Sequence, residues 1–282
     1  MTIKSILCIF GGAQDELSAV NTALILGKAN GAQSRFLHIS PNPAAYAGLY
    51  GEGVIATATI VEAVEKENKE RMEKAKRHVV ALTAKHHVPL DGPESPAHHA
   101  SAKFVHLTGF LDNEIAREGR LSDLIIVGRG ADAPNALDDS VVIAALFNTG
   151  RPVMLMPKQE AKAPGEYKTV AVAWKGTKEA SQAIYNAMPF LEKAEKVIVL
   201  TAEGHGETYD LVAEGALMEY LRLHGIHAQG IVVAAGTRTP AEALLARADE
   251  PAHAFLDDRL LTADAIEPAD APPPSAAREI DD

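Results

Sequence analysis

Two glycines and a serine, set between two apolar segments, are the residues with the clearest potential for chemistry in this sequence. Gly128 and Gly130 follow the apolar run "DLIIV", and Ser140 precedes the apolar stretch "VVIAALF". Glycines after a strand let backbone N–H groups approach phosphate oxygens, and the N-terminus of a helix favours an anion. The spacing therefore predicts a phosphate-cradling loop between a buried strand and a helix.

Two carboxylates oppose this interpretation, because Asp138 and Asp139 stand directly before Ser140. A carboxylate at an N-cap or in a first turn accepts the free N–H groups itself. One like-charge contact at about 4 Å costs about 4 kcal/mol at an effective dielectric near 20. Two such contacts remove micromolar binding, which is worth about 8 kcal/mol. Three interpretations stay open: a helix cap with turn glycines, an altered nucleotide site, and a site for a different small ligand.

Strand-like and helix-like segments alternate through the first half of the chain. Strands are expected at 5–10, 34–40, 103–108, 122–128 and 152–156, and helices at 15–31, 55–87, 110–119 and 140–149. Helices of crossover length separate the strands, so the pattern predicts an α/β fold with a mostly parallel sheet and helices on both faces. Ser140 would then open the helix that follows the fourth strand.

The pattern restarts in the second half of the chain. Residues 169–191 align with residues 5–26 at an offset of 164 (176 minus 12), which pairs Gly12 with Gly176 and Phe10 with Trp174. We interpret this half as a tandem copy of one α/β unit that stops before its fourth strand. Further strands are expected at 196–201 and 226–236, and helices at 208–225 and 239–248, the last capped by Thr239.

The domain organisation follows from this repeat. We expect a first domain at 1–158, a linker at 159–167, a partial second domain at 168–250 and a divergent acidic tail at 251–282. The tail is rich in Ala, Asp and Pro, a composition typical of disorder. Two origins stay open for it: a changed reading frame or truncation, and a genuine tail on a reduced domain. In both cases the first strand of the second copy should have an unpaired edge, or one covered by the tail or by another chain.

Composition and charge exclude several classes of protein. The chain has 282 residues, of which 47% are apolar and 23% charged, as in soluble globular proteins. Residues 249–282 hold ten acids and two bases, so they carry −8 of the net charge of −11. The rest is nearly balanced and lacks the electrostatic footprint of a nucleic-acid-binding protein. No apolar run approaches the ~20 residues of a membrane span. A lone cysteine and no secretion signal make the cytoplasm the expected location.

With these segments in place, the chain resembles the universal stress protein family in its tandem form. The likeness is carried by "SILCIF", "LHIS", and "DLIIVGRG" leading to "DSVVIAALFNTGRPVMLMP", and in the second copy by "VAVAWKGTKEASQAI" and "AEALLARA". It covers nearly all of 4–158 and about 168–248. The resemblance implies a doubly wound, five-stranded parallel sheet in the order 3-2-1-4-5. It also implies that the copies pair through their last strands, and a role in surviving stress rather than in catalysis. We expect the protein to form a homodimer.

The resemblance further implies a place for an adenine nucleotide. In the family's nucleotide binders the loop after the fourth strand has the pattern G-x2-G-x9-G-S/T. Here one residue separates the first two glycines, and Asp139 replaces the glycine before Ser140. The binders also carry an acid after the first strand, where this chain has Gly11 and, in the second copy, Lys175. We expect nucleotide binding, with ATP as the candidate ligand, to be lost or weak. The candidate cofactor-binding residues are Gly11, Gly128, Gly130 and Ser140.

The remaining motifs predict no metal site and no catalytic residue. His98 and His99 lie in a Pro-rich loop without a cysteine or acid at metal-ligand spacing. His38, at the end of the second strand, is expected to be a packed or hydrogen-bonded imidazole. No nucleophile-elbow motif occurs. The sequence thus predicts a non-catalytic, regulatory or small-ligand-binding stress protein. Two alternatives are an ATP-binding stress switch and a nucleotide- or flavin-dependent enzyme on the same sheet.

Overall fold

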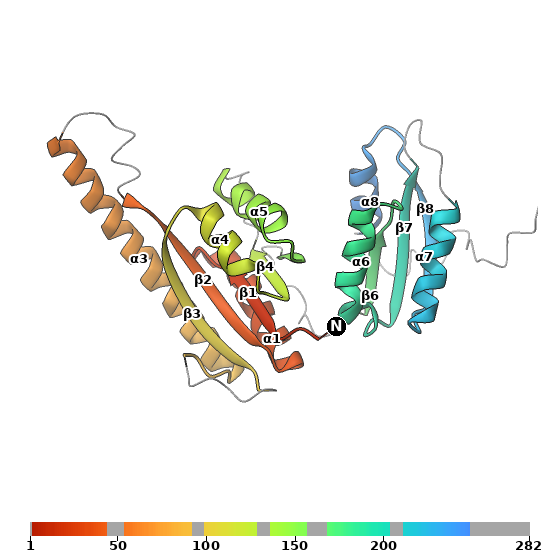
Figure 1. Ribbon diagram of the computed structural model, residues 1–282, viewed down its shortest axis with the longest axis horizontal. Helices are drawn as coiled ribbons and strands as arrows, with labels where there is room; N and C mark the ends of the chain where they lie inside the picture. Colours follow the sequence, from red (N-terminus) through yellow and green to blue (C-terminus); the bar gives the residue numbers. More distant parts are fainter. Residues whose placement is uncertain are drawn as a thin grey trace, which may run out of the picture. The chain divides into compact units, whose positions relative to one another are not determined.

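The computed structural model describes residues 2–43, 54–91, 99–128, 136–156, 168–203 and 211–248. The chain divides into two compact units, Met1–Glu166 and Tyr167–Asp282, which we call unit 1 and unit 2 (Figure 1). The predicted linker at 159–167 and the predicted tail at 251–282 lie outside the described residues, so the domain limits derived from the sequence stay predictions.

Unit 1 contains a single parallel sheet whose strands follow the order β3-β2-β1-β4-β5. This order and the α/β class confirm the fold prediction. β1 lies in the middle of the sheet, where Cys8 is paired with Phe36 on one side and with Ile126 on the other. The strands are β1 (Ser5–Ile9), β2 (Gln33–Pro41), β3 (Ser101–Gly109), β4 (Leu124–Gly128) and β5 (Val153–Met156).

The helices of unit 1 form two layers around this sheet. They are α1 (Leu17–Asn30) and α3 (Val54–His86), which pack on each other, and α4 (Leu111–Gly119) and α5 (Ala136–Asn148), which also pack on each other. A short 3-10 helix, η1 (Gln14–Glu16), precedes α1. Right-handed crossovers run from β1 towards β3 and, in the opposite direction, from β4 to β5, so the two helix pairs cover opposite faces.

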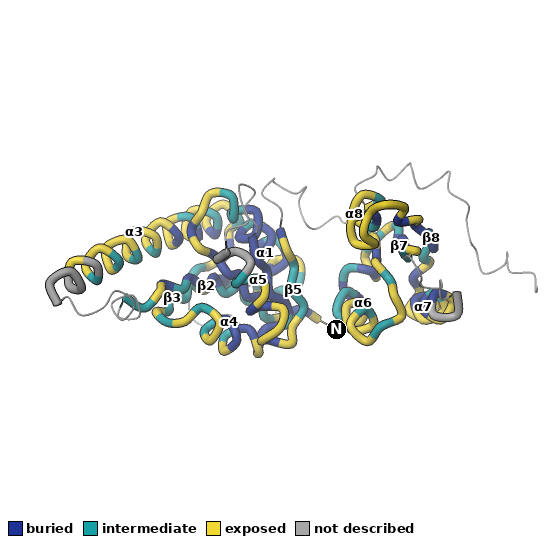
Figure 2. Tube along the Cα trace, turned by 90° about the horizontal axis from the view of Figure 1, so that it is seen from above, coloured by how far each residue is buried: buried dark blue, intermediate teal, exposed yellow. Residues whose placement is uncertain are grey.

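The core of unit 1 follows from the alternation of side chains along these strands. Leu7, Ile9 and Leu37 point to the layer of α4 and α5, together with Ile125 and Val127. The alternate residues point to α1 and α3. Figure 2 shows the buried residues along the strands and the exposed outer surface of α3. Cys8 is fully buried, as predicted, and burial raises the pKa of its thiol, with the negative charge of Glu16 as a second cause.

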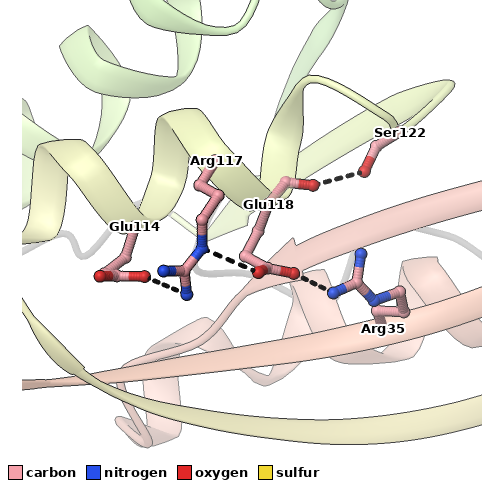
Figure 3. Close-up of polar contacts among 5 residues, drawn as sticks. All are labelled: Arg35, Glu114, Arg117, Glu118 and Ser122. Carbon is pink, nitrogen blue, oxygen red and sulfur yellow. Dashed lines mark hydrogen bonds and ion pairs between the residues drawn. The ribbon is translucent and has the colours of Figure 1, made fainter.

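A polar network fixes α4 to β2 and to the start of β4. Arg35 on β2 forms an ion pair with Glu118 on α4, and both side chains are largely buried (Figure 3). Arg117 contacts Glu118 at 3.4 Å and Glu114 at 2.5 Å. The hydroxyl of Ser122 donates to the Glu118 carbonyl at 3.4 Å. Ser122 lies two residues before β4, so the network connects α4 both to β2 and to the segment that leads into β4.

Unit 2 repeats the first part of this plan. Its sheet is parallel in the order β6-β7-β8, which corresponds to β1-β2-β3. Among the described residues, β6 pairs with β7 alone, in agreement with the predicted open edge. The elements are β6 (Thr169–Ala173), α6 (Lys178–Leu191), β7 (Lys196–Glu203), α7 (Leu211–Leu223), β8 (Ala228–Ala234) and α8 (Pro240–Ala248). The sheet is therefore a partial repeat of the first.

The cap predicted for α8 is present. The Glu242 N–H donates to Thr239 Oγ1 at 3.3 Å, and the Thr239 N–H donates to Glu242 Oε2 at 2.8 Å. This reciprocal pair is a capping box, in which each residue satisfies a backbone donor that the helix leaves free.

One predicted helix boundary was wrong. α5 begins at Ala136 rather than at Ser140, which places Ser140 in the second turn of the helix. Asp138 and Asp139 are its third and fourth residues, so Asp139 is not an N-cap. The earlier start has a physical reason, because alanine and leucine favour helix and acids in the first turn interact well with the helix dipole. The other predicted elements differ from the observed ones by a few residues at their ends.

Candidate functional site

The structure brings two of the predicted site residues together at the carboxyl edge of the unit 1 sheet. β1 connects to β2 on one side, and β4 connects to β5 on the other, so the chain leaves these neighbouring strands in opposite directions. Such a switch point is where open α/β sheets bind their ligands. Gly11 lies two residues after β1, and Gly128 is the last residue of β4. We call this place, with Gly11 and Gly128, the β1/β4 switch point.

The side chain of Glu16 lies between these two glycines. A Cβ atom on Gly128 would stand 2.9 Å from Glu16 Cα and 3.0 Å from Glu16 Cβ. A Cβ atom on Gly11 would stand 3.2 and 3.3 Å from the two carboxylate oxygens. Neither glycine could carry a side chain without moving Glu16. Both glycines are thus explained by the close approach of this glutamate, a packing role that needs no phosphate.

Local backbone geometry directs Glu16 to this place. Gly12 has φ +97°, a conformation that favours glycine, and turns the chain away from the sheet after β1. Ala13 is extended, and its N–H donates to Glu16 Oε2 at 3.1 Å. Gly12 also packs closely on α3, since a Cβ atom there would lie 3.1 Å from Ala75 Cβ. The turn, the packing and the hydrogen bond together hold the carboxylate over the strand ends.

Sequence reasoning missed Glu16. Its hydrogen bond to the Ala13 N–H is the second half of a capping box, in which an acid three residues into a helix reaches back to the N-cap. That motif normally begins with serine or threonine, and here it begins with alanine, which hides the signal. The sequence therefore indicated the two glycines but not the side chain that lies between them.

Glu16 places a negative charge at the switch point. The negative charge of Glu16 contributes to the raised pKa of the Cys8 thiol below it. A phosphate about 4 Å from this carboxylate would face a repulsion of about 4 kcal/mol at an effective dielectric near 20. The Ala13 N–H, a donor that a phosphate could use, is already bonded to the carboxylate.

The other predicted site residues have different outcomes. Gly130 lies outside the described residues. Ser140 is half-buried on α5, in the second turn rather than at the helix start. Asp138 and Asp139 belong to the first turn by their backbone, and their side chains also lie outside the description. Gly11 and Gly128 thus lie on either side of Glu16, whereas Ser140 lies inside its helix and not at the helix N-terminus.

Histidines occupy the neighbouring strand ends. His38 is 3% exposed, and its Nδ1 lies 3.0 Å from the Phe10 carbonyl oxygen, which assigns the proton to Nδ1 in the neutral ring. Burial lowers the pKa of His38, although the bond to Phe10 acts in the opposite direction. His106 Nε2 lies 2.9 Å from Ser40 Oγ. The hydrogen-bonded imidazole expected at His38 is confirmed.

Neither a metal centre nor a membrane span is found in the part of the chain that the structure describes. Within it, no three His, Cys, Asp or Glu side chains are grouped so that they could hold a metal ion. Within the same residues, no helix is long and apolar enough to cross a bilayer. His99 is exposed, and its neighbour in sequence, His98, lies outside the described residues.

Comparisons with known proteins agree with this architecture. No family model matches the sequence, and no curated protein matches it. A universal stress protein from Archaeoglobus fulgidus DSM 4304 matches the structure with a TM-score of 0.60 at 14% identity, covering 86% of this chain and 80% of that one. Universal stress protein UspA from Lactobacillus plantarum gives a TM-score of 0.39 at 14% identity, over 55% of this chain and 99% of its own. A universal stress protein in complex with cAMP gives a TM-score of 0.33 at 13% identity, covering 56% of this chain and 100% of that one.

The archaeal match defines the fold of this chain. The chain falls in the class of α/β folds with a doubly wound sheet and a β1/β4 switch point. Within that class it has the universal stress protein fold, as the sequence resemblance predicted. An alignment over 86% of the chain extends beyond unit 1 into unit 2.

Proposed function

We propose that this chain is a non-catalytic stress-response protein of the universal stress type. It acts as a regulatory module in the cytoplasm, and its unit 1 binds nucleotide weakly or not at all. The fold supports the class of protein. The single observation that supports weak or absent nucleotide binding is the Glu16 carboxylate between Gly11 and Gly128.

The groups nearest the switch point support a non-catalytic role. The Cys8 thiol is fully buried and its pKa is raised, so little thiolate forms at neutral pH. The proton of His38 is on Nδ1, so its basic nitrogen is Nε2, and the side chain that carries it is only 3% exposed. Acid–base or nucleophilic chemistry would need one of these groups to be exposed and free.

The ATP-binding switch is the second candidate, because strand ends at a switch point are the usual place for a nucleotide. Equilibrium dialysis with labelled ATP separates the two. A repulsion of about 4 kcal/mol weakens micromolar binding roughly a thousandfold, so the unmodified protein should bind ATP no more tightly than about 1 mM. Glu16→Ser removes both the charge and the bulk, and should tighten binding at least tenfold.

Two further variants make this experiment specific. Glu65→Ser removes one exposed acid from α3 and should leave ATP binding unchanged. Asp139→Gly restores the glycine of the family's loop and measures the contribution of α5 separately. Micromolar binding of ATP by the unmodified protein would reject our proposal in favour of the switch.

We also propose that the protein is a tandem of two related domains and forms a homodimer through α5 and β5. β5 is the last strand of the unit 1 sheet, and large apolar side chains are exposed beside it. These are Ile143, Leu146 and Phe147 on α5 and Leu155 on β5, which we call the α5/β5 patch. Exposed apolar surface of this kind marks interaction sites.

Oligomeric state tests the dimer proposal. Phe147, which is 78% exposed, should anchor the interface, so Phe147→Glu should convert a dimer to a monomer in light scattering after gel filtration. Leu121→Glu places the same charge on another highly exposed apolar residue outside the patch, and should leave the mass unchanged. A monomeric unmodified protein at micromolar concentration contradicts the proposal.

A further inference from the structure

Three histidines from three elements gather near Phe10 on the α1/α3 side of the unit 1 sheet. The Nδ1 atom of His38 on β2 lies 3.0 Å from the Phe10 carbonyl oxygen, and the His38 ring lies 5.7 Å from the ring of His106, its register partner on β3. His78 on α3 packs on the Phe10 ring, with ring centroids 6.2 Å apart. We call His38, His78 and His106 the Phe10 histidine cluster. Through His78 and Phe10, α3 contacts the ends of β1 and β2.

The two histidines on the strands have basic or neutral neighbours. In the part of the chain that the structure describes, neither His38 nor His106 has a carboxylate partner, and His106 Nε2 lies 2.9 Å from Ser40 Oγ. Burial lowers the pKa of His38, and the charges of His106 and of Arg71 on α3 act in the same direction. Arg71 is paired with Glu67 at 2.5 Å, but that acid is exposed to solvent. A proton on His38 would therefore add a positive charge beside other basic groups.

His78 has the same kind of surroundings on α3. Its Nδ1 atom is buried and has no hydrogen-bond partner within the described residues. Burial lowers the pKa of His78, and the neighbouring charges of Lys74 and Arg77 add to this effect. The acids nearest to these bases on the helix, Glu70 and Glu73, are exposed. A proton on His78 would thus leave a charged ring with a buried N–H group that has no acceptor, which is costly.

The N-terminal part of α3 extends past the strand ends and contacts the sheet at few points (Figure 1). Asn68 Nδ2 donates to the Pro41 carbonyl at 3.0 Å. Gly12 packs on Ala75, since a Cβ atom on this glycine would lie 3.1 Å from Ala75 Cβ. Most residues from 62 to 74 are exposed. The contact between the histidine cluster and Phe10 therefore makes up a large share of what holds this part of the helix.

The C-terminal part of α3 is held by different contacts. Val79 is fully buried, and Thr83 is 2% exposed. Lys28 on α1 donates from Nζ to the His86 carbonyl at 3.0 Å, and His86 Nε2 lies 2.6 Å from Asn21 Oδ1. A proton on His86 could still be donated to this amide oxygen. Protonation of histidines therefore leaves the attachment of this part to α1 in place.

The positive charge that protonation adds would fall on the less firmly held part of the helix. It is relieved if that part moves away from the strand ends and the imidazoles reach water, because a buried charge without a partner is costly. We propose that the Phe10 histidine cluster is an acid-sensitive latch. When it takes up protons, residues 62–78 of α3 leave the strand ends, while residues 79–86 stay on α1. The opening uncovers Phe10.

Hydrogen exchange of the full-length protein tests the latch, because it reports local opening segment by segment. Protection factors, which are corrected for the effect of pH on intrinsic exchange, are compared at about pH 7.5 and about pH 5, on either side of the usual histidine pKa. We expect peptides that cover residues 62–78 to lose protection about tenfold or more at the lower pH. Peptides that cover residues 79–86 should lose less than about twofold.

Variants of the cluster test its role. Glutamine keeps a hydrogen-bond donor but does not titrate in this range. His78→Gln should therefore reduce the loss of protection at least threefold, and the double variant His38→Gln/His78→Gln should nearly abolish it. His99→Gln changes an exposed histidine outside the cluster, and should leave the loss unchanged. Thermal unfolding at the higher pH checks that each variant folds, and the single variant suffices if the double variant does not.

Three results would overturn the proposal. The first is unchanged protection of residues 62–78 at the lower pH. The second is an equal loss over residues 79–86, which would mean that unit 1 unfolds as a whole. The third is a folded His78→Gln variant that loses as much protection as the unmodified protein. No nucleotide is used, so the outcome is independent of the ATP experiment on the β1/β4 switch point.

Discussion

β1 of unit 1 and β6 of unit 2 start from the same sequence pattern and end in different environments. Leu7 and Ile9 of β1 are buried against α4 and α5. The corresponding residues of β6 are Ala171 and Ala173, and both are exposed. The other face is similar in the two units, since Cys8 and Val172 are both buried beneath the first helix. This face of the first strand is therefore buried only where the elements that follow the third strand, α4 and α5 in unit 1, are present to cover it.

The largest effect that this comparison predicts is on stability. Leu7→Ala should lower the free energy of unfolding by about 2–5 kcal/mol, because it leaves a cavity at a fully buried site. The converse change, Ala171→Leu, should alter it by less than about 0.5 kcal/mol, because the side chain is exposed. Denaturant unfolding followed by circular dichroism measures both. A cost above 1 kcal/mol for Ala171→Leu would mean that this face of β6 is covered.

Two glycines should respond to alanine with opposite signs. Gly128→Ala in unit 1 pushes a methyl group into the Glu16 backbone, and should destabilise the protein by about 1–3 kcal/mol. Gly215→Ala in α7 of unit 2 meets nothing within 4 Å, and should stabilise it by about 0.5–1 kcal/mol, because glycine is a poor helix former. Thermal unfolding of both variants checks this. A neutral Gly128→Ala would show that Glu16 is free to move.

The smallest predicted effect is a difference in pH dependence between the units. His38 has a folded pKa below its usual 6.5, so the unfolded chain binds the proton more tightly, and unit 1 should lose stability as the pH falls below about 6.5. Glu214 has a folded pKa above its usual 4.5, so unit 2 should lose stability as the pH rises from about 4.5.

Single substitutions separate these two pH dependences. Unfolding is measured between pH 4 and pH 8. His38→Gln should reduce only the loss of stability of unit 1 at falling pH, and Glu214→Gln should reduce only the loss of stability of unit 2 at rising pH. Trp174 fluorescence follows unit 2 selectively, since it is the only tryptophan. If His38→Gln leaves the loss of stability at acid pH unchanged, the effect belongs to the other histidines of unit 1 whose pKa is lowered, which are His78, His86 and His106.

Much of the fold could be predicted from the sequence because it depends on local patterns. Apolar runs of strand length, separated by helical segments, indicated the α/β class and the restart at residue 169. The Thr239 cap was predicted because its motif lies within four residues. The start of α5 was missed, because Ser140 resembles a helix opener while Ala136 carries no capping signal.

The candidate site shows the limit of local reasoning. Gly11 and Gly128 were identified individually, but their common neighbour Glu16 depends on β1 and β4 being paired, and these strands are more than 100 residues apart in sequence. Likewise, Ser181 and Ala216 line one open pocket beside Trp174 in unit 2 only because α6 and α7 face each other.

The sequence by itself determined the kind of elements, their order and the restart of the pattern at residue 169, since each rests on periodicity or composition along a few residues. Only the tertiary structure decided which side chains share a space. The carboxylate between two glycines in unit 1 and the open pocket in unit 2 both arise from residues on separate elements. Their contacts are fixed by strand register and helix packing, which no local pattern encodes.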